Sequence, residues 1–256
     1  MSGKIRLVVF CAFCLSAFPY TVAQSAKPDA QSYVRRNSFG IFGEYSNDSS
    51  HMLLGQAENR KLLTVGGSYA YRFVSSRYAT VQYLAEVRPF ILTSDPVAID
   101  VVTVASLGPG VIAVANTPTP TPVSRCVAGV FTSQYNDPYS GQTYFYTDTV
   151  TCSRRWTFAQ GLSPAGFKIN FRPHHRIQPV VAGLAGYMFS TKPVPTNGAG
   201  SFNFTFELGG GVEAFQSHGR SMMLEYRYHH YSNKNSAGEN PGVDNGLFKL
   251  TYTFGR

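Results

Sequence analysis

Eight segments in which apolar and polar residues alternate follow one another along this chain, and this pattern constrains the fold more than any other feature. Successive side chains of a β-strand point to opposite faces, so each segment predicts a strand with one apolar and one polar face. In the clearest segment, Phe202, Phe204 and Phe206 share one parity, while Asn203 and Glu207 share the other. The eight predicted strands span residues 38–46, 61–73, 78–92, 165–171, 177–190, 202–215, 220–232 and 246–255.

The connections between these segments alternate between short and long. The short ones are 74–77, 172–176 and 216–219, and the long ones are 46–60, 93–164, 191–201 and 233–245. Short turns at one end and long loops at the other are typical of outer-membrane β-barrels, and a closed ring pairs every strand edge, as a bilayer requires. We therefore predict an all-β fold: an eight-stranded antiparallel outer-membrane β-barrel, built as a meander, with one long extracellular loop at about 93–164.

The polar faces of these strands predict what fills the barrel. An eight-stranded barrel is just filled by its side chains, so we expect ion pairs inside it and no pore. A soluble lipocalin-like barrel or sandwich is the alternative, but its core would hold fewer large aromatic residues than these apolar faces supply. The ionisable residues expected inside are Glu86, Arg88, Glu207, Glu213, Glu225 and Arg227.

The N-terminus has the features of a secretory signal peptide. Lys4 and Arg6 precede an apolar run, and Ala23 ends a small-residue cleavage site. We expect a signal peptide at residues 1–23, a single β-barrel domain at 24–256 and a location in the outer membrane. Removal of residues 1–23 takes Lys4 and Arg6, so the formal net charge falls from +8 to +6, and this basic character favours anionic surfaces, including phosphorylated lipids.

Two cysteines remain after the predicted signal peptide, Cys126 and Cys152. An even pair in an exported protein predicts a disulfide, and the alternative is two free thiols.

The end of segment 220–232 combines a histidine with a serine. His230 and Ser232 share the parity of the apolar face, so both are expected on the outside of the barrel at its external rim, towards the outer-leaflet lipid. A serine hydroxyl needs a base to take its proton as it attacks an acyl carbonyl, and the base needs an acidic partner. Asp244 leads into the neighbouring strand with outward parity, whereas Glu239 lies further from either strand. This pattern predicts an esterase that acts on acyl chains.

At these residues the chain resembles the PagL-type lipid A 3-O-deacylase family. The matching motifs are His-Tyr-Ser-Asn at 230–233 and Asn-Pro-Gly-Val-Asp at 240–244. Leu-Glu-Tyr-Arg at 224–227 and Gly-Gly-Gly-Val-Glu at 209–213 are also similar to the family. The resemblance covers residues 165–254 well and the N-terminal third only by pattern.

The resemblance implies an outer-membrane barrel that removes an ester-linked acyl chain, the 3-O chain, from lipid A or lipopolysaccharide. It implies that His230 is the general base, Ser232 the nucleophile and Asp244 the orienting acid, and that Asn233 is a candidate oxyanion donor. The best-known family members carry Glu where this chain has Asp244, whose shorter side chain requires a closer backbone.

Two other functions remain open. The first is a non-catalytic small outer-membrane barrel, OmpW- or adhesin-like, which acts through its long loop. The second is an acyltransferase, because the same acyl-enzyme could pass its chain to an acceptor other than water. We expect no cofactor, no metal site and no nucleic-acid partner, because the sequence has no phosphate-binding glycine loop, no zinc-type spacing and no nucleic-acid patch. A homodimer remains possible.

Overall fold

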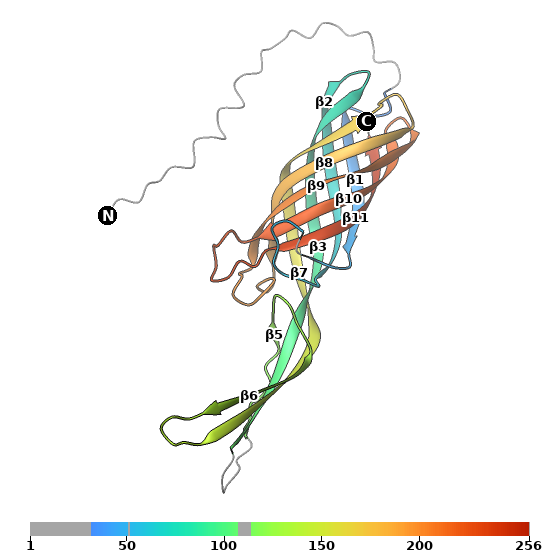
Figure 1. The fold of residues 1–256 in the computed structure, drawn as a ribbon. Helices are drawn as coiled ribbons and strands as arrows, with labels where there is room; N and C mark the ends of the chain where they lie inside the picture. Colours follow the sequence, from blue (N-terminus) through green and yellow to red (C-terminus); the bar gives the residue numbers. More distant parts are fainter. Residues whose placement is uncertain (1–31, 51, 107–113, 256) are drawn as a thin grey trace, which may run out of the picture. The chain divides into compact units, whose positions relative to one another are not determined.

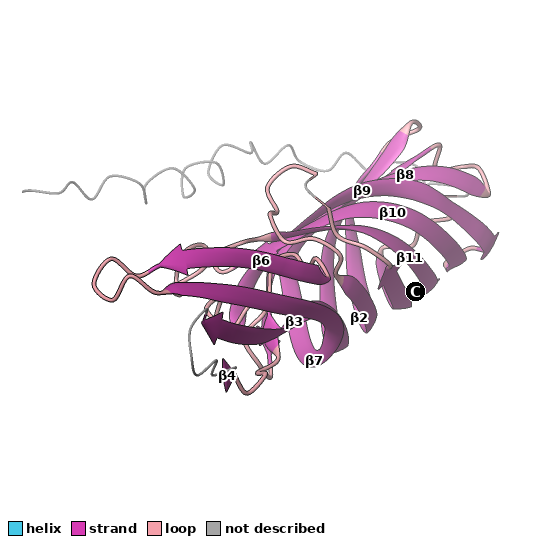
Figure 2. Ribbon diagram, turned by 60° about the horizontal axis from the view of Figure 1, so that its bottom comes forward, coloured by secondary structure: helices cyan, strands magenta, loops and turns pink. Residues whose placement is uncertain are grey.

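The computed structural model describes residues 32–50, 52–106 and 114–255. The predicted signal peptide at residues 1–23 lies outside the described residues. Strands joined by loops make up the described chain (Figure 2). Within these three ranges there is no helix with the length and apolar character to span a bilayer.

The eight predicted strands are all present, and most of their boundaries agree within three residues with the prediction. Two strands, β3 and β7, extend far beyond the predicted ends. The strands are β1 (Asn37–Ser46), β2 (Lys61–Ser75), β3 (Ala79–Ser106), β7 (Thr143–Phe171), β8 (Ile177–Ser190), β9 (Phe202–Ser217), β10 (Arg220–Ser232) and β11 (Val243–Gly255). Three short strands lie between β3 and β7: β4 (Val114–Ala115), β5 (Thr121–Pro122) and β6 (Gly129–Asn136).

These eight long strands form a closed antiparallel ring (Figure 1). Consecutive neighbours pair in the order β3-β2-β1-β11-β10-β9-β8-β7, and β7 pairs again with β3. The first strand lies beside the last, with Ser38 opposite Gly255, so the start of β1 and the end of β11 share one end of the ring with the short turns. The longer connections lie at the opposite end.

The prediction of a long loop at 93–164 is wrong, because most of these residues form strands. Beyond the ring, β3 and β7 continue as a pair as far as Ser106 opposite Tyr144, and β6 adds to the free edge of β7. We call the described residues 95–106 and 114–155 the arm. A run rich in β-branched valines at 97–104 favours a strand, but both of its faces are apolar, so the alternating pattern that predicts a strand is missing.

The disulfide predicted within this region is present. The sulfurs of Cys126, which lies between β5 and β6, and Cys152, on β7, are bonded, and their Cα atoms are 6.0 Å apart. The bond ties the segment before β6 to the long β3–β7 pair.

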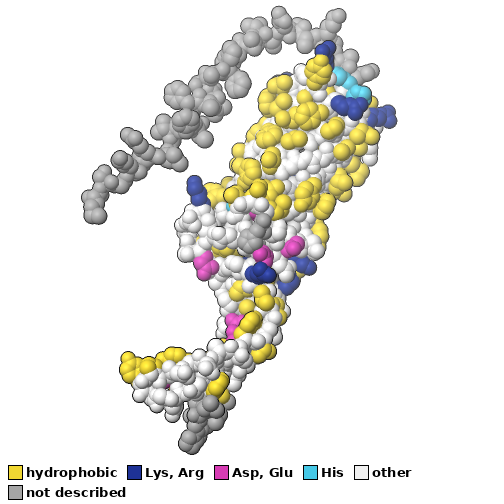
Figure 3. Space-filling view, in the orientation of Figure 1, with side chains coloured by type: hydrophobic (Ala, Val, Ile, Leu, Met, Phe, Trp, Pro, Cys, Tyr) yellow, Lys and Arg dark blue, Asp and Glu magenta, His cyan; other side chains and the backbone are white. Residues whose placement is uncertain are grey.

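The outward face of the ring carries a belt of exposed apolar and aromatic side chains (Figure 3). Lys, Arg, Asp and Glu side chains gather beyond this belt (Figure 3). On the seam of β1, β11 and β10, the members of the belt are Phe39, Ile41, Tyr45, Met222, Leu224, Tyr226, Phe248, Leu250, Tyr252 and Phe254.

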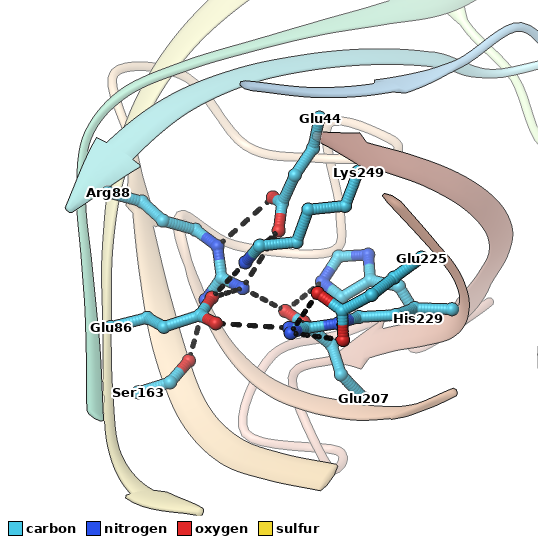
Figure 4. Close-up of polar contacts among 9 residues, drawn as sticks. Glu44, Glu86, Arg88, Ser163, Glu207, Glu225, His229 and Lys249 are labelled. Carbon is cyan, nitrogen blue, oxygen red and sulfur yellow. Dashed lines mark hydrogen bonds and ion pairs between the residues drawn. The ribbon is translucent and has the colours of Figure 1, made fainter. Parts of the chain in front are cut away.

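The interior of the ring is filled by a buried network of charged side chains, as predicted (Figure 4). Arg227 donates to Glu86 at 3.1 Å, to Glu207 at 3.0 Å and to Glu225 at 2.9 Å. Lys249 donates to Glu86 at 2.6 Å. The prediction missed Glu44, Lys168 and Lys249 among these buried side chains. It also missed the buried ion pair of Arg60 with Asp95.

An apolar cluster closes the interior towards the long connections. It joins residues of the ring to residues of the connecting loops, so the loops at this end are packed onto the barrel. Its members are Ala57, Leu62, Ile91, Ala159, Met188, Val194, Tyr231, Val243 and Leu247.

Candidate functional site

Strict alternation along β10 sends neighbouring ionisable residues to opposite sides of the barrel wall. Arg227 and His229 are buried inside, whereas Tyr228 and His230 lie on the outward face and are partly exposed. Ser232, the last residue of β10, is on the same outward face and is also partly exposed. The structure therefore places His230 and Ser232 on the predicted face, at the end of the ring where the long connections lie.

Asp244 stands directly opposite His230 in the register of β10 and β11. Residues that pair directly across two antiparallel strands have side chains on the same face. His230 Nδ1 lies 2.7 Å from Asp244 Oδ1, and the Tyr228 hydroxyl donates to the same oxygen at 2.8 Å. His230 and Asp244 are thus in direct contact, despite the short side chain of Asp.

The loop between β1 and β2 completes the surroundings of this acid. The backbone N–H groups of Leu53 and Leu54 donate to Asp244 Oδ2 at 2.7 and 2.9 Å. A carboxylate that accepts several N–H and O–H donors is stabilised in its ionised form. The side chain of Asp244 has no exposed surface, and 13% of the His230 side chain is exposed.

Sequence reasoning did not find these two donors. Leu53 and Leu54 contribute backbone groups, which carry no residue-specific signal, and they are about 190 residues from Asp244 along the chain. The only hint in the sequence is the glycine that follows them. A Cβ added to Gly55 would lie 2.5 Å from the backbone nitrogen of Asp244, so the close approach of loop and strand requires glycine there.

The Asn-Pro-Gly part of the second motif shapes the turn into β11. Gly242 has a φ of +56°, a left-handed conformation that favours glycine. A Cβ at this position would also lie 3.2 Å from Cε1 of His230. The Asn240 side chain accepts the backbone N–H of Asn233 at 3.1 Å, which ties the end of β10 to the start of this turn.

Ser232 is near the pair without being bonded to it. In the part of the chain that the structure describes, no hydrogen bond joins Ser232 Oγ to His230. Two residues along one strand face have Cα atoms roughly 6.6 Å apart, so the two side chains are neighbours. Hydrogen bonds of catalytic groups are often long without substrate and shorten when it binds.

Asn233 has a structural environment. It is buried, and its side-chain amide donates to the carbonyl oxygens of Ala199 and Glu239, the latter at 2.6 Å. With its backbone N–H on Asn240, every N–H donor of Asn233 is engaged. An oxyanion role for Asn233 stays a prediction, and it would require one of these contacts to break.

Three buried carboxylates inside the barrel lie close enough to share a cation. Ligand oxygens of Glu44, Glu86 and Glu207 are within 4.8 Å of one another. Each of these carboxylates is ion-paired with an arginine or lysine of the chain, namely Arg88, Arg227 or Lys249. Their role in the structure is the charged network of the interior.

Comparisons with known proteins bear on this arrangement. A family model described as lipid A 3-O-deacylase (PagL) matches residues 128–253, a range that contains His230, Ser232 and Asp244. Among curated proteins no sequence matches the chain.

Several solved structures are similar to this one. The outer-membrane enzyme PagL is 12% identical with a TM-score of 0.46, over 85% of this chain and 99% of that one. Neisserial surface protein A (NspA) is 10% identical with a TM-score of 0.42, over 86% of this chain and 97% of that one. The outer-membrane protein OprG from Pseudomonas aeruginosa is 10% identical with a TM-score of 0.35, over 88% of this chain and 100% of that one.

The family match confirms the resemblance that the motifs near the C-terminus predict. From residue 128 to residue 253, the chain carries the sequence pattern of the lipid A 3-O-deacylase (PagL) family.

Proposed function

We propose that this protein is an outer-membrane carboxylic-ester hydrolase that removes an ester-linked acyl chain, the 3-O chain, from lipid A. The observation that carries the proposal is the contact of 2.7 Å between His230 and Asp244, beside Ser232, on the outward face of the ring. The family match over residues 128–253 supports lipid A as the substrate.

The apolar belt supports a location in the membrane. A closed ring leaves no unpaired strand edge, and a continuous outward band of apolar and aromatic side chains is stable in lipid but not in water. With the short turns and the described ends of the chain on the periplasmic side, the long connections face outwards. His230 and Ser232 are then at the level of the outer leaflet, where the lipid A of lipopolysaccharide lies.

We propose a role for each residue of the site. The carboxylate of Asp244 accepts the Nδ1 proton of His230, an assignment made from the contact, and this leaves Nε2 free to act as a base. In the first step Ser232 Oγ attacks the acyl carbonyl, Nε2 takes the hydroxyl proton, and Asp244 stabilises the imidazolium. The proton then goes to the leaving sugar oxygen, and a water molecule activated by His230 releases the fatty acid.

Mass spectrometry of lipid A from cells that express the wild type or Ser232→Ala tests this proposal. The wild type should remove one hydroxyacyl chain, and the variant should leave lipid A unchanged, because loss of the nucleophile lowers such rates by on the order of 10⁴-fold or more. Ser236→Ala, which changes an exposed serine of the next loop, is the matched control and should act as the wild type does.

Folding of each variant is checked by the resistance of the barrel to unfolding in SDS without heating. Unchanged lipid A in cells that contain folded wild-type protein would contradict the proposal and favour a non-catalytic barrel that acts through its arm. A phospholipid or other acceptor that gains the released chain would identify an acyltransferase.

A further inference from the structure

The loop between β1 and β2 folds over the outward wall of the barrel at β11. The backbone N–H of Gln56 donates to the carbonyl oxygen of Pro241 at 2.7 Å, and that of Ala57 donates to Gly242 at 3.1 Å. Ala57 also forms a bridge with Val243. These contacts fix the loop against the strand that carries the acid of the candidate site.

Three apolar residues of this loop are exposed at its outer surface. The exposed fractions are 43% for Met52, 77% for Leu53 and 65% for Leu54. We call these three residues the apolar finger. Three consecutive large apolar side chains that face water are unfavourable there, because moving apolar surface from water into an apolar environment lowers the free energy.

The finger is continuous with the apolar belt. Its backbone contacts the carboxylate of Asp244, which is on the outward face of β11, four residues before the belt residue Phe248 on the same face. Tyr228, which also binds Asp244, follows the belt residue Tyr226 on the outward face of β10. The finger therefore extends the apolar belt, which is covered by lipid if the protein lies in the outer membrane.

We propose that Met52, Leu53 and Leu54 insert among the acyl chains of the outer leaflet, and that this contact holds the loop in the position where its N–H groups orient Asp244. The occupant of the finger's surface is the acyl region of membrane lipid. This inference adds a lipid-contact element to the proposed deacylase and rests on that function for its effect on catalysis. Binding to lipid and assembly of the acid–histidine pair are thereby linked through two backbone N–H groups.

The link predicts that hydrolysis depends on the lipid surface. In a bilayer, burial of the finger stabilises the loop that holds Asp244. In a Leu53→Gln/Leu54→Gln variant both N–H donors remain, but this burial is lost. We expect this variant to hydrolyse lipid A in vesicles about tenfold more slowly than the wild type, which corresponds to the loss of about 1.4 kcal/mol.

Fluorescence quenching tests insertion without any need for activity. Trp156 is the only tryptophan, so Trp156→Phe combined with Leu54→Trp gives a protein with one reporter, in the finger. The full chain is refolded into phosphatidylcholine vesicles whose acyl chains carry bromine. We expect strong quenching by the brominated chains and weak quenching by iodide in the aqueous phase.

Two single-tryptophan controls calibrate the signal. Leu250→Trp places the reporter in the belt, and Tyr139→Trp places it in a fully exposed turn of the arm. A finger reporter that behaves as the belt reporter does supports the proposal; one quenched by iodide, as expected for the arm reporter, overturns it. If the folded wild type leaves lipid A unchanged but the finger is quenched by bromine, the proposed function fails while insertion stands.

Discussion

The inward and outward faces of β10 carry similar residue types with opposite consequences. Inside, Arg227 bonds to three carboxylates and is fully buried. Outside, His230 bonds to one carboxylate and keeps part of its ring exposed, next to Ser232, whose hydroxyl bonds to neither of them. Ionisable groups whose bonding capacity is filled stabilise the barrel, whereas groups with free capacity at the surface can act on a substrate.

The difference lies in how many partners each face provides. Inside the ring, the strands converge on a narrow space, so carboxylates of β1, β3, β9 and β10 surround the cationic groups of β3, β10 and β11. On the outer wall the neighbours include apolar belt residues, and the hydrogen-bond partners that the described residues supply to His230 and Asp244 belong to β10, β11 and the loop between β1 and β2. Four predictions test this comparison, in order of decreasing effect.

Removing the charge of Asp244 should have the largest effect of the four changes, and the property affected should be the rate of deacylation. In Asp244→Asn the amide cannot stabilise the imidazolium and favours the wrong tautomer of His230, so deacylation should fall by on the order of 10³–10⁴-fold. The measurement is the initial rate of fatty-acid release from lipid A in vesicles. Asp137→Asn, in an exposed turn of the arm, is the control and should match the wild type. Wild-type rates in Asp244→Asn would remove this residue from the site.

Removing the charge of Arg227 should instead affect stability. Arg227→Met leaves Glu86, Glu207 and Glu225 with one cationic partner fewer, and breaking a buried pair in this way costs about 3–5 kcal/mol. Reversible unfolding by urea in vesicles measures this loss. Arg125→Met removes an exposed pair with Glu58 and should cost at most about 1 kcal/mol. Equal losses in the two variants would show that the interior network adds no more than a surface pair.

The alternation of residues predicts which side chains face each other, and this is why so much of the barrel follows from the sequence. The parity of β10 and β11 placed Glu225 and Arg227 inside and His230 and Asp244 outside, and the structure agrees. A period of two residues is a local property, so it is visible without any knowledge of distant contacts.

Two features of the molecule could not be predicted in this way. The N–H donors of Leu53 and Leu54 belong to the backbone and are separated from Asp244 by about 190 residues of chain. The arm was missed because its strand at 97–104 is apolar on both faces, which hides the alternation. Local patterns therefore predicted the wall of the barrel but not the contacts that form above it.

Removing a single donor of the outer site should have a moderate effect. Tyr228→Phe deletes the hydroxyl that donates to Asp244, and a hydrogen bond of this kind contributes about 1 kcal/mol. We expect deacylation to slow by about fivefold at most, through a less well oriented carboxylate, and the free energy of unfolding in urea to fall by no more than about 1 kcal/mol. Tyr226→Phe, two residues earlier on the same face, is the control. A loss as large as that of Asp244→Asn would instead make the Tyr228 hydroxyl part of the catalytic chemistry.

Removing the disulfide should have the smallest effect, both on the activity of the outer face of β10 and on the stability of its inner face. Cys126 and Cys152 join two parts of the arm, and the hydrogen bond that Cys126 forms among the described residues goes to the carbonyl oxygen of Val97, which is also in the arm. A cross-link acts mainly by restricting the segment that it closes, here residues between β5 and β7. Cys126→Ser/Cys152→Ser should therefore change the rate of deacylation by less than about twofold and leave urea unfolding of the barrel unchanged, while proteolysis within the arm becomes faster. A large loss of deacylase activity would show that the arm contributes to the site, and the outer face of β10 could then no longer be treated as complete with its adjacent strand and one loop.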